Sequence, residues 1–380
     1  MASISINNNL NKVLIFSANT SWYLFNFRQN TIKAFINNGY KVFCLSPLDD
    51  YSCLLEDIGC TWIKLNMDNK GFNPLADLKF FFNLLNIFLR VKPTAVFNFT
   101  IKNNIYGTFA SFLLGIRSIN NISGFGTAFI HSGFRYFIAR RLYIFALRLS
   151  TKVFCQNTDD YKFILENKFV HESRIDLLPG SGVDLKKFKR KANIIYPPKN
   201  DFIFIYAGRL LYDKGIKELI NAFDQIDQSR FPSKLWIIGF RDSKNISAIK
   251  QSDIGKWNKR LNISILEPSD SIEAVLSEAS CFVLPSYREG MPRSILEACA
   301  MELPIICTDV PGCRDIVTNN LNGYLCKPHD DQSLLEAMKK MLRLPFEKRL
   351  KMGVEGRKRV EQSFNEEIVI KKALDVIDDI

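Results

Sequence analysis

The chain has 380 residues, of which 47% are hydrophobic and 24% are charged. This length and composition suit two globular domains and argue against a disordered chain. The net charge of +12 favours a phosphate-bearing partner, namely a nucleotide, a nucleic acid or an anionic membrane surface, without choosing among them. The first twelve residues are polar, and no run of 18 apolar residues occurs, so neither a signal peptide nor a membrane-spanning helix is expected.

The first half of the chain alternates short apolar segments with amphipathic ones, which is typical of an α/β domain with parallel strands. Strands are predicted at 12–18, 41–46, 61–67, 95–100, 118–123 and 153–157. Helices are predicted at 24–38, 75–91, 104–115 and 133–150.

The same alternation restarts after 189–200, a polar and proline-containing segment that suits a domain boundary. Strands are predicted at 202–207, 234–239, 263–266, 281–284 and 304–307. Helices are predicted at 214–228, 243–251, 270–279, 292–301 and about 365–379. The chain therefore predicts an α/β protein of two Rossmann-like, doubly wound domains.

The most informative segment is PSYREGMPRSILEACAMELPIICTDVPGCRDIV, which ends at residue 317. It follows one predicted strand, so its helix should begin at the carboxyl edge of a parallel sheet, where free N–H groups favour a phosphate. Glu289 and Glu297 stand around that turn and would accept hydrogen bonds from sugar hydroxyls. Gly290, Met291 and Pro292 form the turn and would line the same nucleotide-sugar pocket. The ordinary alternative is a helix with two exposed glutamates.

A second cluster, AGRLLYDKGIKELI, follows the strand predicted at 202–207. Gly208 ends that strand, and Arg209 and Lys214 flank the loop that opens the next helix. A guanidinium and an ammonium there would bind a diphosphate and stabilise the negative charge of a departing nucleoside diphosphate. Since the helix dipole disfavours lysine at a helix N-terminus, a phosphate partner explains Lys214 better than an incidental surface position.

The spacing of Glu289 and Glu297, with PSYREGMPRSILEA and TDVPGCRD around it, resembles the E-x7-E motif of retaining GT-B glycosyltransferases of family 4. The chain is similar in particular to the bacterial polysaccharide branch, which includes undecaprenyl-diphosphate-linked α-N-acetylgalactosaminyltransferases. The resemblance implies that Glu289 contacts the donor sugar and Glu297 the ribose, while Arg209 and Lys214 hold the diphosphate. Glu289, Arg209 and Lys214 are the expected catalytic residues.

The resemblance also implies the GT-B fold, in which two Rossmann-like domains face a cleft. We expect an acceptor-binding domain at 1–188, a nucleotide-sugar-binding domain at 189–364, and a C-terminal helix at 365–380 that packs back on the first domain. The first strand-to-helix loop, SANTSWYLFNFRQN, lacks the GxGxxG of a dinucleotide-binding domain and resembles the opening of the same family branch.

Further segments of the first half, MDNKGFNP, FTIKNNIYG and NNISGFGTAF, also resemble this branch and would line the acceptor side of the cleft. Lys102 would anchor an acceptor phosphate, although a solvated lysine is the ordinary alternative. Asn103 and Phe125 depart from the family's usual proline and leucine, which leaves the acceptor's identity open. The expected acceptor or cleft residues are Asn19, Thr20, Arg28, Lys102, Gly124 and Gly126.

The segment 133–152 is a basic amphipathic helix whose aromatic and aliphatic residues recur at helical spacing. Two interpretations stay open for it. It could lie in an anionic membrane interface, or it could pack on the core with its arginines extended to water. The apolar helix at 75–91 raises the same question.

The residues and the resemblance together predict a retaining glycosyltransferase. It would move a sugar, with N-acetylgalactosamine favoured, from a UDP-sugar to a lipid-linked saccharide during O-antigen, capsule or glycan assembly. No cofactor and no metal are expected, because the DxD motif of GT-A enzymes is absent and cationic side chains would replace the ion. Nine scattered cysteines without a CxxC pair indicate a reduced, cytoplasmic protein, peripheral on the inner face of the cytoplasmic membrane.

Three alternatives stay open. A sugar-nucleotide epimerase of the same fold would convert a donor without an acceptor. A nucleic-acid-binding protein would suit the net charge, but the sequence contains no recognisable binding motif, so nucleic acid is not expected as a partner. A non-catalytic scaffold in a membrane assembly complex would tolerate the loss of Glu289 and Glu297.

Overall fold

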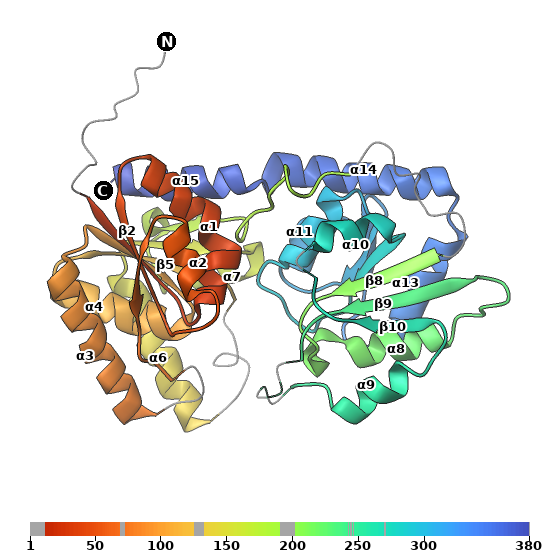
Figure 1. Ribbon diagram of the computed structural model, residues 1–380, viewed down its shortest axis with the longest axis horizontal. Coiled ribbons are helices and arrows are strands. Elements are labelled where there is room, and N and C mark those ends of the chain that lie inside the picture. The colour runs from red at the N-terminus through yellow and green to blue at the C-terminus, as the bar shows by residue number, and fades with distance from the viewer. Residues whose placement is uncertain are drawn as a thin grey trace, which may run out of the picture. The chain divides into compact units, whose positions relative to one another are not determined.

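The computed structural model describes residues 12–68, 73–124, 133–190, 202–241, 243, 245, 247–269 and 271–379, with the side chain of Arg135 left out. The chain divides into two compact units (Figure 1). Unit 1 combines Met1–Ser181 with Glu367–Ile380, and unit 2 is Gly182–Glu366. Each unit is a parallel sheet covered by helices, so the predicted α/β class with two doubly wound sheets is confirmed.

The described part of unit 1 contains a seven-stranded parallel sheet in the order β3-β2-β1-β4-β5-β6-β7. Alternate residues of β1 face opposite sides of the sheet: Leu14 and Phe16 enter one hydrophobic cluster and Ile15 another. The strand order reverses beside β1, which places the loop after β1 at a switch point of the sheet. The strands are β1 (Val13–Ser17), β2 (Lys41–Ser46), β3 (Thr61–Lys64), β4 (Ala95–Phe99), β5 (Arg117–Ile122), β6 (Lys152–Cys155) and β7 (Ile175–Leu177).

Helices cover both sides of this sheet. α1 and α15 pack on the side of Phe16, where α15 contributes Val369 and Ala373 to the core, and α3 packs on the side of Ile15. The elements are α1 (Ser21–Asn37), α2 (Ser52–Asp57), α3 (Pro74–Val91), the π-helical turn η1 (Asn103–Gly107), α4 (Thr108–Leu113), α6 (Phe134–Leu149), α7 (Thr158–Glu166), the 3-10 turn η2 (Glu172–Arg174) and α15 (Glu366–Asp378).

Unit 2 holds, within its described residues, a six-stranded parallel sheet in the order β10-β9-β8-β11-β12-β13. Its strands are β8 (Phe202–Ala207), β9 (Ser233–Ile238), β10 (Ile263–Leu266), β11 (Cys281–Leu284), β12 (Ile305–Thr308) and β13 (Gly323–Cys326). Its helices are the 3-10 turn η3 (Tyr212–Lys214), α8 (Ile216–Asp224), α9 (Gln251–Trp257), α10 (Ile272–Glu278), α11 (Arg293–Ala300), α12 (Cys313–Ile316), α13 (Asp331–Arg343) and α14 (Phe346–Ser363).

One predicted helix, at 243–251, is wrong. The described residues of that stretch form a loop in which Ala248 pairs with Leu211 in an isolated antiparallel bridge, and the helix α9 begins only at Gln251. Polar side chains satisfy the backbone locally, as where Asn245 accepts a hydrogen bond from the Ser247 N–H over 2.9 Å. Such bonds compete with helix formation.

Other differences concern the start of a helix and elements that were not predicted, among them α2, α7, η2 and β7 of unit 1. The helix predicted from residue 214 is interrupted by Gly215, whose φ of 70° lies in the left-handed region, so α8 starts after it. Between residues 308 and 364, where no elements are predicted above, lie α12, β13, α13 and α14. In the described ranges, no helix is long and apolar enough to cross a membrane.

Candidate functional site

The candidate donor site is built from loops at the carboxyl ends of β8 and β11, and these loops approach each other closely. A Cβ at Gly215 would lie only 2.0 Å from the carbonyl oxygen of Pro285, and a Cβ at Gly239 would lie 1.7 Å from that of Gly208. Only glycine permits these approaches. The Gly215–Pro285 approach packs the turn that carries Lys214 against the loop that leads to Glu289, and the Gly239–Gly208 approach joins the ends of β8 and β9.

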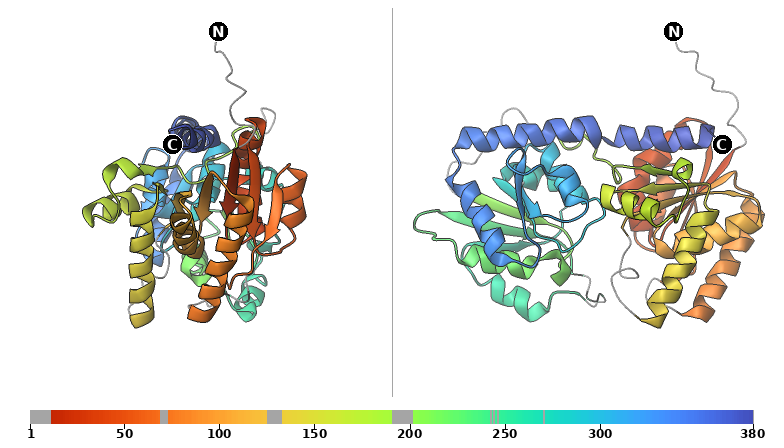
Figure 2. Two further views of the ribbon diagram at one scale, coloured as in Figure 1. Left: turned by 90° about the vertical axis from the view of Figure 1, so that its left-hand side faces the viewer. Right: turned by 180° about the vertical axis from the view of Figure 1, so that it is seen from behind.

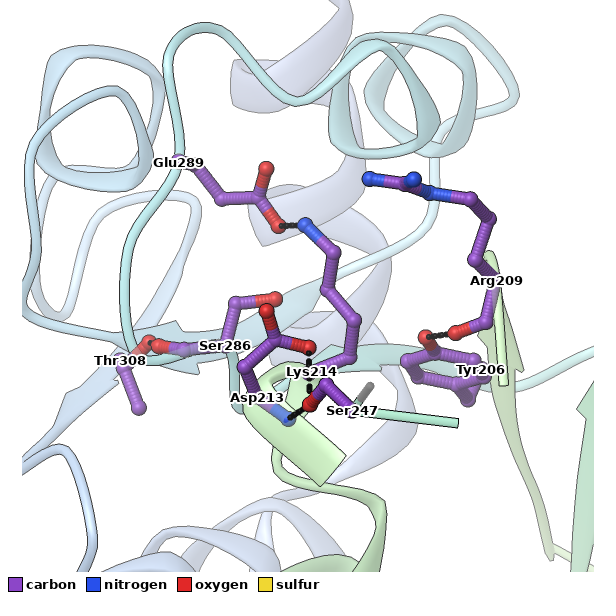
Figure 3. A network of polar contacts seen from close by, with 8 residues as sticks. All are labelled: Tyr206, Arg209, Asp213, Lys214, Ser247, Ser286, Glu289 and Thr308. Atoms are coloured by element: carbon purple, nitrogen blue, oxygen red, sulfur yellow. Dashed lines mark hydrogen bonds and ion pairs between the residues drawn. The ribbon is translucent and has the colours of Figure 1, made fainter. Parts of the chain in front are cut away.

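Lys214 and Glu289 form an ion pair that joins the two clusters predicted from the sequence. The Lys214 Nζ lies 2.5 Å from Glu289 Oε1 (Figure 3). Only 17% of the lysine side chain and 13% of the glutamate side chain are exposed, so the pair is shielded from water and its hydrogen bond is charge-assisted. Two residues that lie 75 positions apart in the sequence therefore meet in the structure.

Arg209 follows β8, and its guanidinium extends toward the same region as the Lys214–Glu289 pair (Figure 3). Its backbone carbonyl accepts a hydrogen bond of 2.8 Å from the hydroxyl of Tyr206, a buried residue. Burial, and then the negative charge of Glu289, raise the pKa of Tyr206 well above its usual value, while Arg209 lowers it. The Tyr206 phenol therefore stays protonated beside the opposite charges of Glu289 and Arg209.

The turn that carries Lys214 is clamped by the segment around Ser247, which the sequence did not reveal as part of the site. The Tyr212 N–H donates to the Ser247 carbonyl over 2.7 Å, and the Ser247 hydroxyl donates to Asp213 Oδ1 over 3.1 Å (Figure 3). The Tyr212 hydroxyl donates to Asp253 Oδ2 over 2.6 Å. No local sequence signal reveals these contacts, because they join two segments more than 30 residues apart.

A residue of β12 fixes the loop that follows β11. The Thr308 hydroxyl donates to the carbonyl of Ser286 (Figure 3). The Ser286 side chain is fully buried, and its Oγ has no hydrogen-bond partner among the described residues. The loop is therefore fixed through its backbone, whereas the Ser286 hydroxyl makes no hydrogen bond to a described residue.

The turn residues predicted to line the pocket lie against the start of α12. Gly312 has a φ of 77°, and a Cβ there would come within 2.3 Å of the Gly290 carbonyl oxygen and 3.3 Å of the Met291 nitrogen. Pro292 is buried directly before α11. Gly312, in the VPGC sequence, therefore lets the start of α12 pack directly on the backbone of Gly290 and Met291.

Glu297 lies on α11 and is paired within its own helix. Its Oε1 is 2.9 Å from the Nε of Arg293, four residues earlier, and 15% of its side chain is exposed. Burial raises the pKa of Glu297 above its usual value, and the charges of Arg293 and Lys187 partly oppose this effect. Arg293 could have been found from the sequence, because residues four apart lie on the same side of a helix.

The candidate acceptor residues belong to unit 1, and several have structural partners. Thr20 caps α1, where its hydroxyl accepts a 3.0 Å hydrogen bond from the Tyr23 N–H, and Asn19 stands just before it. Lys102 is neutralised by Asp77, whose Oδ1 lies 2.7 Å from the lysine Nζ.

Arg28 is buried, with 2% of its surface exposed. Its guanidinium lies 4.7 Å from the centre of the Phe99 ring, and its Nη1 donates to the Gly180 carbonyl over 3.4 Å. Its Nε and Nη2 have no hydrogen-bond partner among the described residues. Gly124 has a φ of 110°, and Gly126 lies outside the described residues.

Metal chemistry was not expected for this chain. Within the part of the chain that the structure describes, no group of three or more His, Cys, Asp or Glu side chains could hold a metal ion.

Comparison with known families matches both halves of the chain. Residues 12–157 match the family described as "Glycosyl transferase 4-like", and residues 187–359 match "Glycosyl transferases group 1". The two regions together span most of the chain. The chain therefore belongs to the glycosyltransferases, as its E-x7-E segment indicates, and it is an enzyme of that class.

Three curated relatives align with most of the chain. The capsular polysaccharide biosynthesis glycosyltransferase CapM of Staphylococcus aureus is 28% identical over 77% of this chain and 79% of its own. The N,N'-diacetylbacillosaminyl-diphospho-undecaprenol alpha-1,3-N-acetylgalactosaminyltransferase of Campylobacter jejuni is 26% identical over 84% and 86%. The UDP-Gal:alpha-D-GlcNAc-diphosphoundecaprenol alpha-1,3-galactosyltransferase of Escherichia coli is 27% identical over 82% and 81%.

The fold is also that of a solved structure. HepE of Anabaena, crystallised with UDP and glucose, superposes with a TM-score of 0.81 over 97% of this chain and 100% of its own, at 15% identity. At this identity the likeness concerns the fold alone. The two-unit GT-B architecture predicted from the sequence is confirmed.

Proposed function

We propose that this glycosyltransferase moves a sugar, with N-acetylgalactosamine favoured, from a UDP-sugar to a saccharide carried on undecaprenyl diphosphate, with retention of anomeric configuration. The observation that carries the proposal is the Lys214–Glu289 pair of 2.5 Å, with the Arg209 guanidinium extended toward it. Two cations beside one carboxylate suit a ligand that has a diphosphate next to a sugar.

The relatives support the acceptor class and the donor base. Those of C. jejuni and E. coli are named for acceptors on undecaprenyl diphosphate and for transfer of N-acetylgalactosamine or galactose. CapM is named for capsular polysaccharide, and the E. coli relative is named for UDP-Gal as its donor. We infer a role in surface polysaccharide assembly, in an O-antigen, a capsule or a related glycan, at the cytoplasmic face of the membrane.

Each donor-side residue has a distinct part in this proposal. Lys214 has three N–H donors, so its ammonium can keep Glu289 and still donate to a diphosphate oxygen. Arg209 offers a planar pair of donors to the same diphosphate. Glu289 accepts a hydrogen bond from a donor-sugar hydroxyl. Glu297 accepts hydrogen bonds from the ribose, while Gly208 and the Gly290–Pro292 turn allow the nucleotide to approach the backbone.

The proposed reaction needs no protein nucleophile. The bond between the sugar anomeric carbon and the UDP oxygen breaks, a bond to an acceptor hydroxyl oxygen forms on the same face, and the hydroxyl proton passes to the departing diphosphate. The charge that develops on UDP is the charge that Arg209 and Lys214 face. Donors already oriented toward developing charge contribute most to lowering a barrier.

The acceptor is assigned to unit 1. Lys102, Asn19, Thr20, Arg28, Gly124 and Gly126 remain the proposed acceptor residues. The Lys102 ammonium is paired with Asp77 in the structure. An acceptor phosphate would therefore compete with the Asp77 carboxylate for this ammonium or share it. Membrane attachment through the basic helix at 133–152 is part of the same proposal.

The test is a transfer assay with purified protein, a synthetic undecaprenyl-diphosphate-linked saccharide and a panel of UDP-, GDP- and CMP-sugars. We expect product only with a UDP-sugar, and an α-linkage by NMR. Glu289→Gln, Arg209→Ala and Lys214→Met should each lower turnover by about a hundredfold or more. Conversion of the donor without any acceptor would instead identify an epimerase.

A further inference from the structure

Unit 1 carries a large apolar surface formed by the outward-facing side chains of α3, α4 and α6. These helices lie side by side on one side of the sheet (Figures 1 and 2), and α4 packs against both of the others. Of the 16 exposed large hydrophobic side chains in the described part of the chain, ten belong to these three helices. Apolar exposure of this extent on one surface is unusual for a protein without a partner there.

On α3, the exposed residues form a single stripe. Leu75, Leu78, Phe82 and Leu89 are 73%, 51%, 59% and 54% exposed, and their spacing keeps them on one side of the helix. The opposite side holds the buried residues, such as Leu84. The helix is therefore apolar on two sides, of which only one is covered by the sheet.

On α6, the outward stripe combines aromatic and basic side chains. Phe134, Phe137, Arg141, Phe145 and Arg148 follow one another at helical spacing, and all five are exposed. The Arg141 guanidinium stacks 5.1 Å from the centre of the Phe137 ring. The core side of α6 is a different set, which includes Tyr143, Ala146 and Leu147, so the exposed stripe is not needed for packing on the sheet.

Charge on this surface has one sign. Lys79 and Arg90 are exposed beside the α3 stripe, and Arg141 and Arg148 are exposed on α6. The sequences of α4 and α6 contain no acidic residue, and α3 contains only Asp77, which is buried and paired with Lys102. An apolar surface bordered by cations and without exposed carboxylates complements an anionic lipid interface, into which aromatic and aliphatic side chains insert.

From this arrangement, we infer that α3, α4 and α6 together form the surface by which the protein docks on an anionic phospholipid bilayer. The inference rests on the proposed function, since it supplies the membrane at which a lipid-linked acceptor would be met, and it extends the docking surface beyond the helix at 133–152. The α3 stripe supplies apolar insertion, and the arginines of α6 supply attraction to anionic head groups.

The test is co-sedimentation with vesicles of phosphatidylglycerol and phosphatidylethanolamine, compared with pure phosphatidylcholine. We expect Leu78→Ser/Phe82→Ser to weaken binding about tenfold or more. Arg141→Gln/Arg148→Gln should weaken it several-fold on anionic vesicles only, and the effect should fade at high salt. The matched control is Leu261→Ser, which removes a fully exposed leucine of unit 2 and should bind as wild type does.

Further measurements separate this inference from the proposed function. Stabilisation by UDP and transfer to a water-soluble, short-chain acceptor should persist in the α3 variant, whereas Glu289→Gln should lose transfer but still bind vesicles. Equal vesicle binding by the wild type and the α3 variant would overturn the inference and leave the proposed function intact. Lipid-free self-association that the α3 variant abolishes, without vesicle binding by the wild type, would identify an interface between copies instead.

Discussion

The Lys214–Glu289 pair allows a quantitative test by a double-mutant cycle. Removing one partner of a wholly buried ion pair costs about 3–5 kcal/mol, because the other charge is left uncompensated. Here 17% and 13% of the two side chains stay exposed, so water compensates part of the remaining charge. We therefore expect Lys214→Met and Glu289→Gln each to lower the free energy of unfolding by about 2 kcal/mol.

The double variant should lose much less than the sum of the two, with a coupling free energy of about 2 kcal/mol. Urea unfolding of the intact protein measures all four states. The control is the pair of Arg260 and Asp224, whose side chains are 38% and 39% exposed and whose coupling should stay below about 1 kcal/mol. Additive losses for Lys214 and Glu289 would refute the reasoning, since the two side chains would then act independently.

Three further predictions concern the same region. Burial raises the pKa of Glu297 above its usual 4.5, so the folded state holds this proton more tightly than the unfolded state does. The free energy of unfolding therefore falls as the pH rises from about 4.5 through the raised pKa. Glu297→Gln should therefore be more stable than wild type at pH 7, with the difference lost below pH 4 in thermal unfolding. Gly312 has a φ of 77°, so Gly312→Ala should lower the free energy of unfolding by more than about 1 kcal/mol. It should also weaken nucleotide binding in calorimetry. The control is Gly255→Ala within α9, where an added Cβ meets no atom within 4 Å. This change should raise the free energy of unfolding by about 0.5–1 kcal/mol. Ser286→Ala removes an unpartnered hydroxyl and should leave stability unchanged or raised, whereas Thr308→Val should cost about 1 kcal/mol in urea unfolding; equal losses in both would contradict this account of the loop.

Much of the fold follows from local patterns in the sequence. Central strands such as β1, β8 and β11 are continuous apolar runs, because parallel strands are buried on both faces. Glycine explains part of what could not be predicted: Gly215 adopts a left-handed conformation and shortens a helix whose apolar pattern looks uninterrupted. The segment around Ser247 was misassigned, because its polar side chains bond locally and to a distant turn.

Two charged residues of the candidate donor site could be singled out from the sequence, and their role at a donor stays a prediction. Glu289 and Lys214 were identified from two separate motifs, and the structure brings them together. The clamp formed by Ser247, Tyr212 and Asp253 could not be foreseen, because nothing local in the sequence marks its contacts. On the acceptor side, Arg28 stays a prediction, and the sequence gave no sign that its side chain would be buried against Phe99.

The most direct test of the central claim, that unit 2 binds a nucleotide sugar at these residues, is thermal stabilisation by UDP, GDP, CMP and their sugar conjugates. The account predicts a rise in melting temperature with UDP and UDP-N-acetylhexosamines that is lost in Glu297→Ala. No rise with any nucleotide, or a rise that persists unchanged in the variant, would contradict it.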